Sequence, residues 1–201
     1  MPNAMTSQPD ARRFATERAF ESWLRKNHAS SDGVWLLIAK PGADKPTITY
    51  PAAVEVALCY GWIDGQKKAI DAHHWLQRFT PRRVRSLWSK ANRARAEALI
   101  QAGRMQPSGM AEIERARSDG RWHAAYEGAR TAVVPTDLQA ALDAEPEAAA
   151  FFAGLDRANR YAVLWRVQTA TRPETRSKRI KSLVAMLARR EKIHGREGRS
   201  K

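Results

Sequence analysis

The sequence predicts an α+β protein, in which a small antiparallel sheet with flanking helices is followed by an all-helical part. Short apolar runs with strand character, such as residues 34–40, occur only in the first half of the chain. Apolar residues at helical spacing recur throughout, and beyond about residue 130 every strong signal is helical. With 201 residues, 43% of them hydrophobic, the chain is long enough to bury a sizeable core.

The first half alternates helical and extended patterns. Pro51 suits the first turn of a helix and Gly61 suits its end. Trp75 and Phe79 are an even number of residues apart and would share one face of a strand, since strand neighbours point oppositely. We therefore expect a helix over 16–27, a strand over 34–40, a helix over 51–60, paired strands within 62–79 around a turn at 71–73, and helices over 89–103 and 110–117.

The second half is predicted to be helical from its caps and its apolar spacing. Thr136 and Gln139 form a capping-box signature before Leu138 and Leu142. Further helices are expected to open at Pro146, to cover 157–171 and to start at Pro173. The resulting organisation is a flexible N-terminal arm (1–13), an α+β domain (14–130), a helical C-terminal domain (131–194) and a flexible basic tail (195–201).

The charge of the chain is strongly positive, with 35 Lys and Arg against 21 Asp and Glu, a formal net charge of +14. Such a charge favours anionic partners: nucleic acid, anionic headgroups, or small acidic or phosphorylated molecules. The single cysteine, Cys59, permits no intramolecular disulfide and fits a reducing compartment. The N-terminus lacks a signal-peptide core, and no segment is apolar enough to span a bilayer. We therefore expect a cytoplasmic protein of undetermined oligomeric state.

The richest segment runs from residue 78 to 95 and holds seven basic residues and no acidic one. Pro81 removes a backbone donor and ends the preceding strand, and Ser86 or Ser89 can cap the next helix. A helix N-terminus beside Arg82 and Arg83 would favour an anion. Trp88 would then either pack in the core or offer a stacking face for a base. The alternative is that the arginines form a solvated face and Trp88 is a core residue.

Asp64 is a second unusual position, because it lies between the apolar Ile63 and Trp62 on one side and Gly65 on the other. We expect it to pair with an arginine of the basic segment or to cap backbone donors. The alternative is a general base with a raised pKa, which makes Asp64 the sole candidate catalytic residue.

The C-terminal helix from Pro173 is basic on one face and apolar on the other. It has no helix-turn-helix partner, which disfavours DNA readout. Residues 137–156 hold five acidic residues and no basic one, so this acidic block is able to face a basic strip within the molecule.

Several catalytic and metal-binding motifs are absent from the sequence. The segment 42–47 lacks the spacing of a phosphate-binding P-loop, and neither the dinucleotide-binding, the zinc-protease nor the nucleophile-elbow pattern occurs. His73 and His74 are adjacent and diverge on a strand. Cys59 is expected to be buried and inert. We expect no metal site and no cofactor.

These residues, taken together, resemble the YdeI/OmpD-associated family, often labelled bacteriocin-protection proteins. The resemblance extends from about residue 14 to 194. It is carried by 20–24, 33–36, 57–65, 79–92, 103–105, 116–122 and 175–180. The resemblance implies a bacterial protein linked to bacteriocin or cell-envelope stress and to an outer-membrane porin. It implies no catalytic residues; its recurrent polar positions map to Asp64, Arg82, Arg83, Ser86, Ser89 and Asn92.

Three functions remain open. The first is a non-catalytic binding protein for an anionic ligand or partner, supporting bacteriocin or stress tolerance. The second is nucleic-acid binding by the segment 78–95 and the C-terminal helix. The third is an enzyme acting on a phosphorylated or carboxylated small molecule, with Asp64 as acid or base. The candidate anion- or ligand-binding residues are Trp62, Asp64, Arg82, Arg83, Ser86, Trp88, Ser89 and Asn92.

Overall fold

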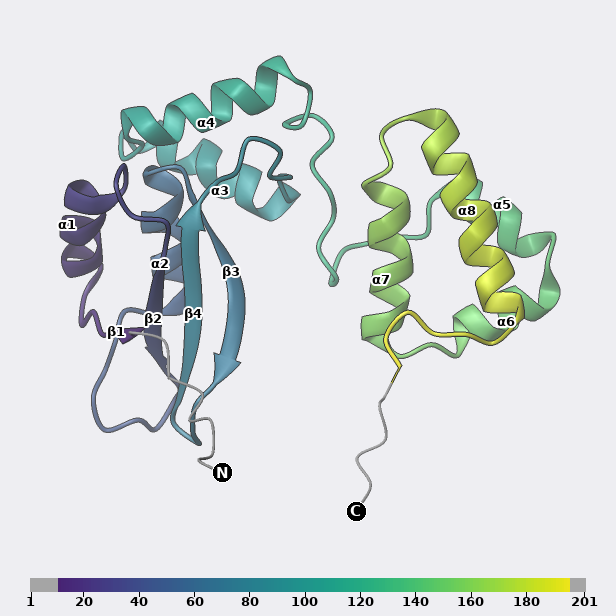
Figure 1. Cartoon of the computed structure of the whole chain (residues 1–201), viewed down its shortest axis with the longest axis horizontal. Coiled ribbons are helices and arrows are strands. Elements are labelled where there is room, and N and C mark those ends of the chain that lie inside the picture. Colours follow the sequence, from purple (N-terminus) through teal and green to yellow (C-terminus); the bar gives the residue numbers. More distant parts are fainter. Residues whose placement is uncertain (1–10, 196–201) are drawn as a thin grey trace, which may run out of the picture. The chain divides into compact units, whose positions relative to one another are not determined.

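The computed structural model describes residues 11–195, which divide into two compact units (Figure 1). The first unit contains the described residues up to Ser86 together with Asn92–Trp122. The second contains Leu87–Ala91 and the described residues from His123 onward. Each unit has its own secondary structure and is described separately below.

A four-stranded sheet forms the centre of the first unit, as far as the described residues show. Its strands are β1 (Ala11–Arg12), β2 (Val34–Ala39), β3 (Trp62–Ala69) and β4 (His74–Pro81), in the order β1-β2-β4-β3. β4 pairs antiparallel with both β2 and β3, whereas β1 pairs parallel with β2. The register of β3 against β4 shifts between Asp64 and Lys67, which places a bulge in the edge strand.

The sheet buries one face against α1 (Glu17–Asn27) and α2 (Tyr50–Cys59), the latter lying behind the sheet in Figure 1. Alternation along β2 directs Val34, Leu36 and Ile38 to the buried side. Phe79, opposite Val34, packs on Phe20 of α1 with ring centroids 5.7 Å apart. The core of this unit therefore lies between the sheet and these two helices.

The helices α3 (Lys90–Gln101) and α4 (Pro107–Ser118) follow the hairpin. The backbone of α4 approaches the end of α2 closely: the amide of Gln106 donates to the carbonyl of Cys59 at 3.0 Å. A Cβ placed on Gly109 would overlap that same carbonyl oxygen. Glycine is therefore required at 109 by the approach of two backbones.

The second unit is helical. A core of leucine, valine and phenylalanine side chains, including the fully buried Leu138, Val163 and Leu187, holds these helices together. Its helices are α5 (Thr136–Asp143), α6 (Pro146–Ala153), α7 (Arg157–Gln168) and α8 (Pro173–Ala188).

The capping box expected at Thr136 does not form. The N-cap of α5 is Pro135, and Thr136 is already the first helical residue. The carboxylate of Asp137 instead accepts the amide of Leu138 at 2.9 Å. The prediction was wrong because Pro135 already has the extended backbone of an N-cap, which moves the helix start one residue earlier than the motif requires.

Asp137 also forms a two-point ion pair within the second unit. Arg176 of α8 donates through Nε and Nη2 to both carboxylate oxygens, at 2.6 and 2.9 Å. Asp156 of the same acidic block caps α7 by accepting the amide of Asn159. These two acidic residues of the block 137–156 therefore act within their own unit.

The Asp137–Arg176 pair predicts a loss of stability in acid. Hydrogen bonds from Arg176 lower the pKa of Asp137 below its ordinary 3.8. Because the folded-state pKa is depressed, the pair stabilises fully above the unfolded pKa and its contribution is lost as the pH falls through the folded pKa. Asp137→Asn should remove this part of the pH dependence. We expect the pair to contribute less than about 1 kcal/mol to the free energy of unfolding, because it is partly exposed. Urea unfolding of both proteins at pH 6 and pH 3 measures the difference, and equal pH dependence would contradict the assignment.

The fold class predicted from the sequence is confirmed: an α+β arrangement with a helical C-terminal part. The sheet is mixed rather than purely antiparallel, because Ala11 and Arg12 add a parallel edge strand. The proposed arm at 1–13 falls mostly, and the tail at 195–201 almost wholly, outside the described residues. After α4, the chain passes from the first unit to the second between Trp122 and His123. The domain boundary expected from the sequence lies between residues 130 and 131. Along residues 11–195, no helix has the length and apolar character that crossing a membrane requires.

Candidate functional site

A pocket of about 620 Å³ lies at the end of the β3–β4 hairpin where the chain leaves β4, within the first unit. Arg78 and Thr80 of β4 are two residues apart and share a face of the strand. Ile63 is the register partner of Thr80 and therefore lies on the same face. The pocket is lined by Asp32, Ile63, Asp64, Gly65, Gln66, Arg78, Thr80, Pro81, Arg82, Arg83 and Ser86.

Arg82 is the most buried of the cationic residues in this pocket, with 5% of its surface exposed. Its amide donates to the carbonyl of Gly61 at 3.0 Å, which continues the pairing of the hairpin past Pro81. Burying a guanidinium is costly unless anions or acceptors surround it. The backbone thus holds a buried cation at one wall of the pocket.

A tight turn positions the rest of this wall. The amide of Arg83 donates to the hydroxyl of Ser86 at 2.9 Å, and the amide of Ser86 donates to the carbonyl of Arg83 at 2.9 Å. Arg121 donates from Nη1 to the carbonyl of Ser86 at 2.7 Å and is itself held by Asp119. Ser86 therefore fixes a turn and does not cap a helix.

Asp64 lines the same pocket, and its hydrogen-bond partner is a tyrosine where an arginine was expected. The hydroxyl of Tyr50 in α2 donates to Oδ2 of Asp64 at 2.7 Å. Burial, together with the neighbouring Asp64, raises the pKa of Tyr50 above its usual range, so this proton stays on the tyrosine. Asp64 and Arg82 both line the pocket, and the role of Asp64 as an acid or base stays a prediction.

The pocket is an electrostatically mixed surface. Its lining includes three arginines, Arg78, Arg82 and Arg83, and two acidic residues, Asp32 and Asp64. The carboxylate of Asp64 is directed to Tyr50 of α2, on the face of the sheet that the helices cover. The arginines can form forked hydrogen bonds to a phosphate or carboxylate. The carboxylate of Asp32 can accept hydrogen bonds from hydroxyl or amino groups of the same ligand. The arrangement suits a small anion that also carries donors.

The structure brings together four of the eight predicted binding residues. Asp64, Arg82, Arg83 and Ser86 line the pocket.

The other four residues lie elsewhere. Trp62 is a core residue with 1% exposure, and its indole donates to the carbonyl of His28 at 3.2 Å. Trp88, only 2% exposed, and Ser89 belong to the second unit, where the amide of Tyr126 donates to the carbonyl of Trp88. Asn92 in α3 accepts from Arg95. The burial of Trp88 leaves no stacking face for a base.

The sequence interpretation missed Asp32, Arg78 and Thr80 as members of this pocket. Asp32 comes from the turn before β2, about 45 residues from the basic segment along the chain. Arg78 was assigned only to the basic segment. Because it is the strand neighbour of the buried Phe79, alternation along the strand places it on the opposite face, together with Thr80. In the described part of the chain, no three His, Cys, Asp or Glu side chains are grouped as metal ligands would be.

Comparison with known families gives two matches along the chain. Residues 12–112 match a model described as "Domain of unknown function (DUF8412)". The chain belongs to the DUF8412 family. The candidate pocket lies entirely inside this matched region.

The C-terminal part of this DUF8412 protein matches a second model. Residues 131–190 match "Bacteriocin-protection, YdeI or OmpD-Associated". The resemblance stated from the sequence over 14–194 is thus supported over this shorter stretch. No curated protein and no solved structure matches the chain.

Proposed function

We propose that this chain is a non-catalytic binding protein for a small anionic ligand, held in the pocket at the end of β4. The observation that carries the proposal is that Arg78, Arg82 and Arg83 all line one concave surface of about 620 Å³. That volume lies within the range of about 300–1,000 Å³ typical of small-molecule sites. The acidic lining residue Asp32 favours a ligand with hydroxyl or amino donors over a bare polyanion.

We further propose that ligand binding serves bacteriocin or cell-envelope stress tolerance and takes place in the cytoplasm. The description of the model matched by residues 131–190, which names bacteriocin protection, supports the first part. The single cysteine, Cys59, suits a reducing compartment and supports the second.

Replacing two arginines of the pocket should weaken anion binding. The double variant Arg78→Gln, Arg83→Gln keeps the buried Arg82, so that the fold is preserved. The double variant Arg82→Ala, Arg83→Ala would also remove a buried side chain and leave a cavity. We expect affinity for inorganic phosphate or citrate to fall at least roughly tenfold, because charge-assisted hydrogen bonds are lost. Isothermal titration calorimetry with each anion measures the loss and ranks phosphate against carboxylate.

The matched control is Arg85→Gln, Arg95→Gln, which removes the same charge from the same basic stretch but outside the pocket. Its affinity for phosphate or citrate should stay at the wild-type value. Equal weakening in both double variants would overturn the local site. If both variants also lost binding to a (dT)12 oligonucleotide, with steep salt dependence, the general nucleic-acid function would replace it.

A further inference from the structure

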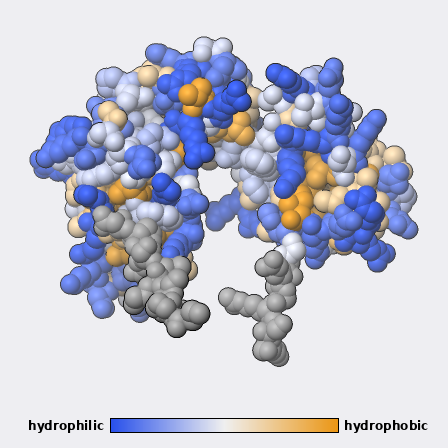
Figure 2. All heavy atoms as spheres, in the orientation of Figure 1, coloured by the Kyte–Doolittle hydropathy of each residue, from blue (hydrophilic) through white to orange (hydrophobic). Residues whose placement is uncertain are grey.

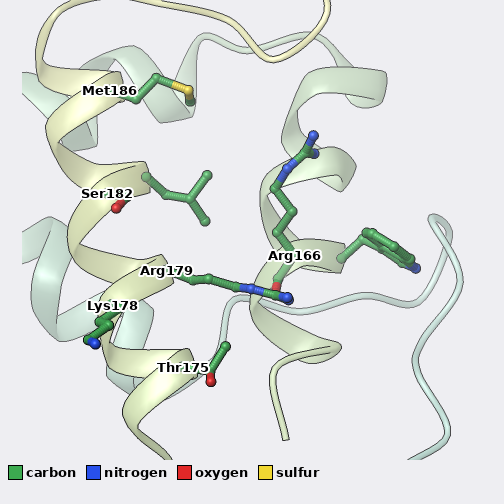
Figure 3. Close-up of a pocket in the computed structure, with 8 residues that line it drawn as sticks. Arg166, Thr175, Lys178, Arg179, Ser182 and Met186 are labelled. Atoms are coloured by element: carbon green, nitrogen blue, oxygen red, sulfur yellow. The ribbon is translucent and has the colours of Figure 1, made fainter. Parts of the chain in front are cut away.

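A second concave surface lies in the C-terminal unit, in the groove between α7 and α8 (Figure 3). Its volume is about 600 Å³. None of its lining residues belongs to the pocket of the first unit. It is lined by Trp165, Arg166, Thr175, Lys178, Arg179, Ser182, Leu183 and Met186.

The floor of the groove is apolar. Leu183 is part of the core of the unit and only 6% exposed, and Met186 packs against the same core. Trp165 is 37% exposed, which is a large apolar side chain to leave in water. Figure 2 shows a hydrophobic patch over α7 and α8, bordered by hydrophilic side chains. This surface can bury the apolar body of a ligand.

The rim of the groove is cationic. Its charged lining residues are Arg166, Lys178 and Arg179, and none of the lining residues is acidic. Arg179 is held in place by donating from Nη1 to the carbonyl of Arg166 at 2.9 Å. Figure 3 shows Arg179 extending from α8 toward α7, whereas Lys178 points away from α7. Arg166 donates from Nη1 to the carbonyl of Ala162 at 3.1 Å, so its guanidinium group lies apart from that of Arg179 along α7.

We propose that the α7–α8 groove binds an amphiphilic organic anion, with its apolar body on Trp165, Leu183 and Met186 and its anionic group at Arg179. Arg166 adds positive charge one turn further along α7. An apolar floor with a charged edge is complementary to a molecule that has an apolar body and one charged end. A nucleic acid is the weaker fit, because its backbone needs a continuous track of cations. Here Lys178 turns away from the two arginines.

The test uses 8-anilinonaphthalene-1-sulfonate as the anionic probe and N-phenyl-1-naphthylamine as its uncharged analogue. The full-length protein should bind one sulfonate probe per chain with a rise in fluorescence. Arg166→Gln, Arg179→Gln should weaken the sulfonate probe roughly tenfold, since charge-assisted hydrogen bonds are removed. Binding of the uncharged analogue should remain unchanged. Trp165→Ala should weaken both probes, because it removes the apolar wall.

The matched control is Arg130→Gln, Lys181→Gln, which removes two exposed charges of the same unit that do not line the groove. Sulfonate binding equal to wild type in this control, with circular dichroism unchanged in every variant, supports the site. An equal loss of sulfonate-probe affinity in the control would overturn the proposed site. Displacement of the probe by (dT)12 or by phosphatidylglycerol vesicles, at equal charge, would also overturn it. The Arg78→Gln, Arg83→Gln variant should bind the probe normally, so this result is separate from the proposed function.

Discussion

Gly109→Ala should destabilise the first unit by about 2 kcal/mol, although the same change in an ordinary helix stabilises. Alanine is favoured over glycine by about 1 kcal/mol inside a helix. At position 109 of α4, however, the added Cβ would overlap the carbonyl oxygen of Cys59 and lie 2.5 Å from Sδ of Met105. Met105 can move aside, but the carbonyl belongs to the backbone of α2. Overpacking of this kind costs about 1–3 kcal/mol or more, so the clash outweighs the propensity.

The measurement is urea unfolding followed by tryptophan fluorescence, with the free energy of unfolding taken from midpoint and slope. Gly65→Ala is a control in the same unit, because its Cβ would lie 3.8 Å from the nearest atom, an ordinary contact. The control should change stability by less than about 0.5 kcal/mol. A Gly109→Ala protein as stable as wild type, or more so, would show that α2 and α4 can separate without cost.

Local signals predicted the elements well and their partners poorly. Pro51 and Pro173 lie in the first turns of α2 and α8, as expected from a residue that fixes φ and lacks a backbone donor. By contrast, the partner of Asp64 is Tyr50, on a helix that precedes its strand. Which donor reaches a carboxylate depends on how a helix packs on a sheet, and neither spacing nor charge encodes that directly.

The predicted site illustrates the same limit. The residues Arg82, Arg83 and Ser86 were found because charge and turn chemistry are local. Trp88 and Ser89 were grouped with them only by proximity in sequence, yet the chain passes into the second compact unit at Leu87. Val84 is 66% exposed, which no charge count anticipated. A contiguous basic segment therefore need not form a contiguous surface.

The bulge in β3 accepts hydrogen bonds from a buried amide, that of Gln77. This side chain is 3% exposed, and its Nε2 lies 3.0 Å from the carbonyl of Gly65 and 3.2 Å from that of Gln66. Those two bulged residues also line the candidate pocket. Gln77 thus links the core of the first unit to the geometry of the binding surface.

Gln77→Met should both destabilise the first unit and weaken anion binding. Methionine has a similar shape but no donor, so the bulge carbonyls lose their partner while the core volume is kept. Each lost hydrogen bond contributes about 1 kcal/mol, which predicts a loss of about 2 kcal/mol in urea unfolding. Phosphate affinity should fall several-fold in calorimetry, because Gly65 and Gln66 are no longer held in place. Gln101→Met, on the exposed surface of α3, should change neither quantity. If Gln77→Met lowers stability but leaves affinity intact, the bulge is structural and the arginines alone define the pocket.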